Sequence, residues 1–220
     1  MIELKNISKI YGSEKKDTFV KALTDIDLTI EDKESVSIIG KSGSGKTTLL
    51  NIIGTLIKPT SGHIIIDGID MAELSLDKLA VFRNEHIGFV YQAYMLEGSL
   101  TATENVALPL MISGEAPKKA FIKAEEMLEK VGLFERRKHK PDELSGGEKQ
   151  RIAIARAMIK DPSLILADEP TGNLDEETGR MIMKWLKELT KEKKFIMVTH
   201  DNELASLADR QIRIKDGRIC

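Results

Sequence analysis

The stretch Ser35-Val-Ser-Ile-Ile-Gly40-Lys-Ser-Gly-Ser-Gly-Lys46-Thr47 decides the fold of this chain. Its first five residues predict a buried β-strand, and the segment from Thr47 to Leu56 predicts a helix. The glycine-rich turn between them fits the phosphate-binding pattern G-x-x-x-x-G-K-[ST] in the context that this pattern requires. A turn that merely connects two elements is the alternative. The residues expected at the phosphates are Gly40, Lys41, Ser42, Gly43, Ser44, Gly45, Lys46, Thr47 and Thr48.

This motif predicts how a nucleotide would be held. Glycine lets the backbone adopt conformations that a Cβ forbids, so that successive N–H groups ring the phosphates at the positive end of the helix. Lys46 is expected to reach the β- and γ-phosphates, and the Thr47 hydroxyl to coordinate Mg²⁺. The sequence therefore predicts ATP and Mg²⁺ as ligands.

Composition excludes several other classes of protein. The chain has 220 residues and a formal net charge of −2, so no strong basic field predicts nucleic acid as a partner. No apolar run approaches the roughly 20 residues needed to span a bilayer, and the N-terminus does not resemble a secretory leader. A single cysteine, Cys220, fits a reducing cytosol. The four histidines lack metal-ligand spacing, which makes a zinc site improbable.

The remaining pattern predicts an α/β protein interrupted by a helical lobe. Strands are expected at the N-terminus, at 63–68 and at 87–91, and again at 164–167, 195–199 and 211–214. Helices are expected at 117–131, with Phe121, Ala124, Leu128 and Val131 on one face, and at 176–191, with Ile182, Trp185, Leu186 and Leu189. We expect one domain, 1–220, with a nucleotide-binding core at 1–92 and 161–220 and a helical subdomain at 93–160.

Two adjacent acids follow a second buried strand, in the stretch Ala167-Asp-Glu-Pro-Thr-Gly-Asn-Leu-Asp175. Acids at a strand's carboxyl end in an α/β protein face the ligand crevice. Asp168 is expected to bind Mg²⁺ through water, because Mg²⁺ keeps several of its waters. Glu169 is the candidate general base for the water that attacks the γ-phosphate. The alternative, a surface pair that starts a turn before Pro170, is less favoured beside a phosphate loop.

A second anion-binding surface is predicted at Leu144-Ser-Gly-Gly-Glu148. Ser145, Gly146 and Gly147 open a helix, where N–H groups without intrahelical partners face outward. Ser145 and Glu148 also match a capping box, and capping is compatible with ligand binding. Because the chain already has one phosphate loop, a second phosphate-binding surface predicts a nucleotide site that is shared by two chains.

With these motifs, the chain resembles the nucleotide-binding subunit of an ATP-binding cassette (ABC) transporter over its whole length. The resemblance implies an α/β P-loop NTPase core with N-terminal antiparallel strands and an inserted helical subdomain. It also implies ATP hydrolysis and a head-to-tail homodimer that encloses two ATPs, in which Ser145, Gly146, Gly147 and Glu148 face the partner's ATP. An integral-membrane permease would hold the chain at the cytoplasmic face of the membrane.

The same resemblance assigns further residues. Tyr11 matches the aromatic side chain that stacks on adenine, and an ordinary tyrosine at a strand end is the alternative. Gln92 matches the glutamine that senses Mg²⁺ and links to the permease. His200 matches the switch histidine at the γ-phosphate, so that Glu169, His200 and Lys46 form the catalytic set. The loop that crosses the dimer interface matches Asn173, Leu174 and Asp175.

Within the family, the segments 83–92, 105–110 and 167–175 are similar to the branch of macrolide exporters, lipoprotein-release systems and antimicrobial-peptide resistance transporters. Three positions depart from the common pattern. Glu148 replaces glutamine, Lys41 stands where proline is frequent, and Ala93-Tyr94-Met95-Leu96 differs after Gln92, on the side expected to face the permease.

Two other functions remain as alternatives. A soluble cassette ATPase of translation or DNA maintenance usually has two cassettes or a long coiled-coil insertion, which this sequence lacks. A regulatory module that binds ATP without hydrolysing it is disfavoured by the intact Lys46, Asp168, Glu169 and His200. The sequence does not identify the transported substrate.

Overall fold

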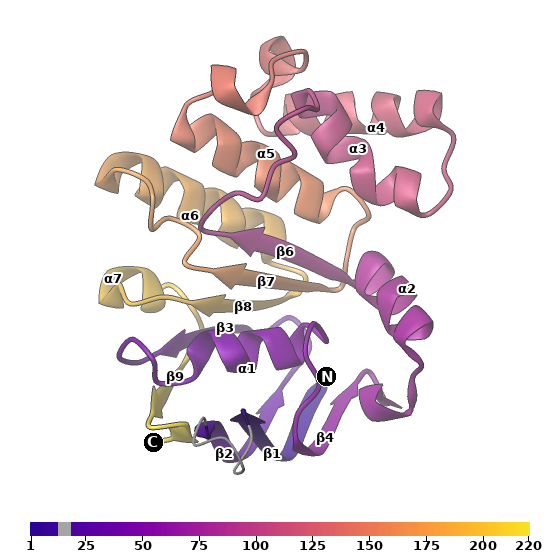
Figure 1. The fold of residues 1–220 in the computed structure, drawn as a ribbon. Helices are drawn as coiled ribbons and strands as arrows, with labels where there is room; N and C mark the ends of the chain where they lie inside the picture. The colour runs from indigo at the N-terminus through magenta and orange to yellow at the C-terminus, as the bar shows by residue number, and fades with distance from the viewer. Residues whose placement is uncertain (13–18) are drawn as a thin grey trace. The chain divides into compact units, whose positions relative to one another are not determined.

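The computed structural model describes residues 1–12 and 19–220. They form two compact units, one made of Met1–Arg83 with Glu192–Cys220 and the other of Asn84–Lys191 (Figure 1). Each unit is described by itself below. The helical subdomain expected at 93–160 lies inside the second unit, and its limits stay a prediction.

An antiparallel sheet of order β2-β1-β4-β5 forms one part of the first unit. Its strands are β1 (Ile2–Tyr11), β2 (Val20–Ile30), β4 (Ser61–Ile66) and β5 (Ile69–Asp70). Ile2 pairs with Ile30 on one side and with Ile66 on the other, and all three side chains are buried. The expected N-terminal antiparallel strands are confirmed.

The other sheet part of this unit is mainly parallel, and two of its strands are almost wholly buried. β3 (Ser35–Ile39) lies between β8 (Lys194–Val198) and β9 (Arg210–Lys215), parallel to both, and β10 (Arg218–Ile219) pairs antiparallel with β9. Because parallel strands are covered on both faces, they consist of continuous apolar runs, and Val36, Ile38 and Ile39 are buried accordingly. Helix α1 (Lys46–Ile53) follows β3 directly after the glycine turn.

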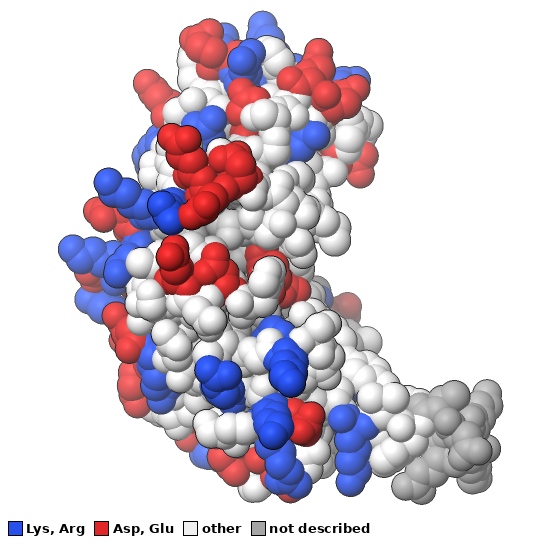
Figure 2. All heavy atoms as spheres, turned by 90° about the vertical axis from the view of Figure 1, so that its left-hand side faces the viewer, with Lys and Arg blue, Asp and Glu red and all other residues white. Residues whose placement is uncertain are grey.

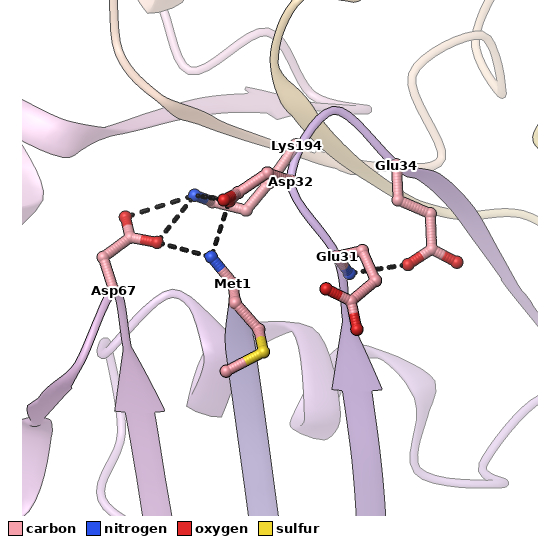
Figure 3. A network of polar contacts seen from close by, with 6 residues as sticks. All are labelled: Met1, Glu31, Asp32, Glu34, Asp67 and Lys194. Atoms are coloured by element: carbon pink, nitrogen blue, oxygen red, sulfur yellow. Dashed lines mark hydrogen bonds and ion pairs between the residues drawn. The ribbon is translucent and has the colours of Figure 1, made fainter.

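A network of charged groups joins the ends of β1, β2 and β4 to the start of β8 (Figure 3). The Lys194 ammonium lies 3.0 Å from Asp32 Oδ1 and 2.9 Å from Asp67 Oδ1, and the α-amino group of Met1 contacts the same two oxygens. Hydrogen bonds from the Met1 ammonium and from Lys194 lower the pKa of Asp32 to about 2. Burial alone would lower the pKa of Lys194, but its two aspartate partners raise it.

The second unit combines two parallel strands with a helical core. β6 (Ile87–Tyr91) pairs with β7 (Leu164–Asp168), so that Tyr91 lies opposite Asp168. The helices are α3 (Ala102–Ile112), α4 (Pro117–Lys130), α5 (Gly146–Met158) and α6 (Glu176–Thr190), with the short turns η3 (Phe134–Arg136) and η4 (Pro141–Glu143). Val106, Leu128 and Ile152 belong to one buried cluster that joins α3, α4 and α5.

The predicted helices of this unit are confirmed, including their buried faces. Ala124 and Leu128 of α4 and Ile182 and Leu186 of α6 are fully buried. Helix α2 (Leu76–His86), most of which belongs to the first unit, was not expected. Its apolar residues do not form a single stripe, since Leu79 and Phe82 are buried while Leu76 and Val81 are exposed. The remaining elements are η2 (Met71–Glu73) and α7 (Asn202–Ala205).

The surface of the described residues carries charges of both signs. On the face drawn in Figure 2, Lys and Arg side chains occur together with Asp and Glu side chains. None of the described helices combines the length and the apolar character that a membrane crossing needs. Cys220 is exposed and has no disulfide partner in the described part of the chain.

Candidate nucleotide-binding site

The glycine turn of the first unit has a backbone that only glycine allows. Gly45, the residue before α1, has φ +106°, and a Cβ there would lie 2.4 Å from the carbonyl oxygen of Ala22. A Cβ on Gly40 would lie 2.2 Å from the carbonyl oxygen of Ile214. The turn is therefore packed tightly against two other strands. No side chain of the described residues caps α1, and its first turn contains no acid, so its N–H groups can donate hydrogen bonds to an anion.

Lys46 and Ser44 give this turn the chemistry of a phosphate site. Lys46 is 9% exposed, and its ammonium donates to the carbonyl oxygens of Gly40 and Lys41 at 2.9 and 3.0 Å. These two acceptors are neutral carbonyl oxygens, so they do not neutralise the positive charge of Lys46. Ser44 Oγ is buried and has no hydrogen-bond partner among the described residues. Buried polar atoms are nearly always paired, and a phosphate oxygen would complete the pairing here.

Tyr11 and His200 also belong to the first unit. Tyr11 ends β1, is 42% exposed, and has the Lys9 ammonium 5.2 Å from its ring centroid. The ring thus already makes a cation–π contact of the kind that aromatic faces favour. His200 follows Thr199 after β8 and is exposed. Thr199 Oγ1 accepts a hydrogen bond from the Asp201 N–H, and this bond fixes the turn on which His200 lies.

The two acids lie in the second unit, at the end of β7. Asp168 is the last residue of the strand, and Glu169 adopts a left-handed backbone with φ +47°. The turn that follows is held by Gln150 of α5, whose Nε2 donates to the Pro170 carbonyl oxygen at 2.6 Å. Gln150 is completely buried. The sequence analysis assigned it no role, although a glutamine between the apolar residues of a helix is a signal that could have been used.

Gln92 and Asn173 bond to each other, although they lie in separate motifs. Gln92 Nε2 donates to Asn173 Oδ1 at 3.2 Å, and Asn173 Nδ2 donates to the Gln92 carbonyl oxygen at 2.9 Å. The backbone at Gly172 packs tightly against the Gln92 side chain, since a Cβ on Gly172 would lie 2.6 Å from Gln92 Nε2. The residue expected at Mg²⁺ and the loop expected at the dimer interface are therefore coupled directly.

The segment after Gln92 is the part of this unit with the most unusual backbone. Tyr94 and Met95 both have positive φ, at 60° and 51°. Arg156 of α5 holds them by donating to both carbonyl oxygens. Burial lowers the pKa of this guanidinium. Arg156 was not expected to have this role, because nothing in the sequence places it beside Tyr94.

The Ser-Gly-Gly-Glu segment starts α5 as expected. Ser145 is the N-cap, its Oγ accepts from the Glu148 N–H, and Glu148 reaches back to the Ser145 N–H. A surface hollow of about 290 Å³ adjoins this helix start. Residues that line the hollow include Ser145, Gly146, Gly147, Glu148, Asn173, Leu174 and Asp175. Asp175 in turn caps α6, and hydrogen bonds from Thr178 lower its pKa.

The predicted site residues thus fall into two sets. The first unit holds the phosphate turn, Tyr11 and His200, and the second holds Gln92, the two acids, the capped helix start of α5 and the Asn173 loop. Among the described residues, no cluster of three or more His, Cys, Asp or Glu side chains is arranged to bind a metal ion. A metal here would need other oxygen ligands, such as the Thr47 hydroxyl and phosphate oxygens.

Comparison with known proteins identifies the family of this chain. Residues 23–172 match the ABC transporter family. The lipoprotein-releasing system ATP-binding protein LolD of Colwellia psychrerythraea is 48% identical over 205 residues, covering 92% of this chain and 80% of LolD. The macrolide export ATP-binding/permease protein MacB of Hyphomonas neptunium is 46% identical, covering 100% of this chain and 34% of MacB.

A solved structure gives the same result at the level of the fold. The dimeric, post-hydrolysis state of the ATP-binding cassette MJ0796 bound to ADP and Pi aligns with a TM-score of 0.91 and 44% identity. The alignment covers 100% of this chain and 96% of that one. The expected P-loop fold is confirmed, and the alternative of a soluble cassette in translation or DNA maintenance is not supported. The chain belongs to the ABC transporter family and is an ATP-binding cassette ATPase of that family.

Proposed function

We propose that this chain is the ATPase subunit of a transporter in the lipoprotein-release and macrolide-export branch. It would bind Mg²⁺-ATP in a head-to-tail homodimer and drive a membrane permease. The observation that carries this proposal is the presence of two complementary anion sites in one chain. One is the start of α1 with Ser44 Oγ, both without a side-chain partner among the described residues, and the other is the start of α5 beside its hollow.

At the phosphates, the turn supplies positive groups and no acid. The Lys46 ammonium exchanges its two carbonyl acceptors for oxygens of the β- and γ-phosphates, and the N–H groups at the start of α1 take the remaining charge. Thr47, Gln92 and Asp168 would hold Mg²⁺, with Asp168 acting through water. The metal would neutralise charge on the phosphate oxygens.

Glu169 is the group proposed to accept the proton of the attacking water. Its backbone is fixed by the turn that Gln150 anchors at Pro170, so that the carboxylate is placed before ATP binds. Such preorganisation matters because a general base must lie within hydrogen-bond reach of the proton that it takes. His200 would contact the γ-phosphate, and the Tyr11 ring would stack on adenine.

In the proposed dimer, Ser145 and Gly147 of one chain face the γ-phosphate held by Lys46 of the other. The dimeric state of MJ0796 with bound ADP and Pi supports a dimer that binds nucleotide. ATP would close the dimer and hydrolysis would reopen it, because the γ-phosphate makes contacts in the closed state alone.

The relatives support a class of permease rather than one particular permease. LolD and MacB are almost equally similar to this chain, so the proposal covers a permease of the type that either would use. The chain would then work at the cytoplasmic face of the membrane, held there by the permease. Export and transmission of motion across the membrane are both compatible with this role.

The test uses Glu169→Gln with Lys46→Ala as the matched control. Glu169→Gln should slow phosphate release by about 10²–10⁴-fold, the range for a lost general base, while it still binds Mg²⁺-ATP and dimerises. Lys46→Ala should neither bind ATP tightly nor dimerise. Unchanged phosphate release by Glu169→Gln would contradict the assignment of the base.

The permease is tested with the same pair of variants. Tagged Glu169→Gln, loaded with Mg²⁺-ATP, is used to capture proteins from detergent-solubilised membranes, which are then identified by mass spectrometry. A permease with few helices and a large extracytoplasmic domain, enriched over the Lys46→Ala control, would support the proposal. Enrichment of ribosomal or DNA-associated proteins alone would refute it.

A further inference from the structure

The hydroxyl group of Ser145 has its proton engaged within its own chain. Ser145 Oγ donates to Glu148 Oε2 at 2.8 Å, and the Ser145 N–H donates to the same oxygen at 2.8 Å. A hydroxyl has a single proton to donate. Any phosphate oxygen that is to receive a hydrogen bond from Ser145 must therefore first displace the Glu148 carboxylate.

The carboxylate is itself held by a second residue. The other oxygen of Glu148, Oε1, accepts from Arg136 Nε at 2.9 Å. Arg136 belongs to η3, and its Nη1 lies 3.4 Å from His139 Nε2. Burial would raise the pKa of Glu148, but the hydrogen bonds from Ser145 and Arg136 lower it, so the group carries its negative charge at neutral pH.

The position of this charge matters for an incoming anion. The hollow beside Ser145 is lined by Glu148 and Asp175, which are acidic, and by Arg151, which is basic. The Glu148 side chain is 16% exposed and that of Arg136 is 49% exposed. A phosphate that enters the hollow thus approaches the Glu148 carboxylate, whose negative charge is partly neutralised by the more exposed Arg136.

We propose that Glu148 and Arg136 are positioning residues that set how readily Ser145 is released to the ATP of a second copy of this chain. The inference rests on the proposed function, in which Ser145 faces the partner's γ-phosphate. Glu148 competes with the phosphate for the Ser145 proton and repels it. Arg136 neutralises the carboxylate. Removing Glu148 should therefore strengthen dimerisation, and removing Arg136 should weaken it.

The experiment measures the dimer dissociation constant in Mg²⁺-ATP by sedimentation, with Glu169→Gln as the common background. Glu148→Gln keeps a capping side chain but removes the charge, and should tighten the dimer. Arg136→Met should weaken it, and Arg136→Lys, which keeps the charge, should restore it. A partly exposed charge changes affinity about threefold. Two sites per dimer make this about ninefold in the dissociation constant.

Salt dependence separates this role from simple helix capping. The effects of Glu148→Gln and Arg136→Met should shrink between about 0.05 M and about 0.5 M salt, because screening weakens charge interactions. A pure loss of capping would instead lower the melting temperature and weaken the dimer equally at both salt concentrations. If Arg136→Met does not fold, Glu148→Gln and Arg136→Lys still decide the outcome.

Two negative results have different meanings. If Ser145→Ala weakens the dimer while the Glu148 and Arg136 variants leave it unchanged at low salt, the positioning role is wrong and the proposed function stands. If the background variant does not dimerise with ATP, or Ser145→Ala has no effect, the proposed dimer contact of Ser145 with the partner's ATP is wrong and the inference falls with it.

Discussion

Replacing Gln150 with leucine should separate activity from stability. Gln150 is fully buried, and its Nε2 holds the Pro170 carbonyl oxygen in the turn just after Glu169. Its Oε1 has no partner among the described residues. Leucine fills a similar volume, so Gln150→Leu removes one hydrogen bond and one unpaired buried oxygen together.

The two changes to stability have opposite signs and similar size. Leaving the Pro170 oxygen without its donor costs about 1–3 kcal/mol, and removing a buried oxygen without a partner recovers a comparable amount. We therefore expect the free energy of unfolding to change by less than about 1 kcal/mol. Activity has no such compensation, since a displacement of about 1 Å in a catalytic group can cost about 10²-fold. The rate constant kcat should fall by about 10–10²-fold.

The assay combines phosphate release with urea unfolding, and Ile152→Val is the matched control. Ile152 lies on the same helix and is buried in the core, so its truncation should cost about 0.5–1.5 kcal/mol of stability and leave kcat unchanged. The reasoning is refuted if Gln150→Leu keeps full kcat, because the Pro170 turn would then not position Glu169.

Two further predictions concern the first unit. The pKa of Asp32 is about 2, below its ordinary value of 3.8, so its ion pairs stabilise the fold fully above pH 3.8, and this stabilisation is lost as the pH falls through 2. The loss of stability between pH 4 and pH 2, followed by circular dichroism, should thus be smaller for Lys194→Met than for the unaltered chain. Equal losses in the two proteins would contradict a stabilising role of the network. Gly45→Ala should destabilise the fold by about 1–3 kcal/mol and weaken ATP binding, because Gly45 has φ +106° and an added Cβ would lie 2.4 Å from the Ala22 carbonyl oxygen. ATP affinity is measured by calorimetric titration, and an affinity equal to that of the unaltered chain would contradict this prediction.

Features of this chain that depend on local sequence could be predicted. The strand, glycine turn and helix around Gly40–Lys46 follow from a spacing that few other structures use, and the faces of α4 and α6 follow from apolar periodicity. The capping box of Ser145 and Glu148 was also evident, since the two residues lie three positions apart. In each case the interacting residues are close in the sequence.

Features that depend on tertiary contacts could not be predicted. Nothing local indicates that Arg156 reaches the carbonyl oxygens of Tyr94 and Met95, 62 and 61 positions away. The bond between Gln92 and Asn173 spans 81 positions. Helix α2 was missed because Leu76 and Val81 face solvent, so that its pattern lacks the stripe by which helices are recognised.

The backbone of Tyr94 and Met95 has a consequence for the diversification of this family. Side chains in left-handed backbone carry a strain of about 1–2 kcal/mol each, which Arg156 offsets from behind. Glycine or asparagine at either position would relieve that strain. Most sites on a folded protein lose stability when they change, but these two can gain it. The segment expected to meet the permease should therefore tolerate glycine and asparagine at these two positions, whereas β-branched residues there should weaken the cassette.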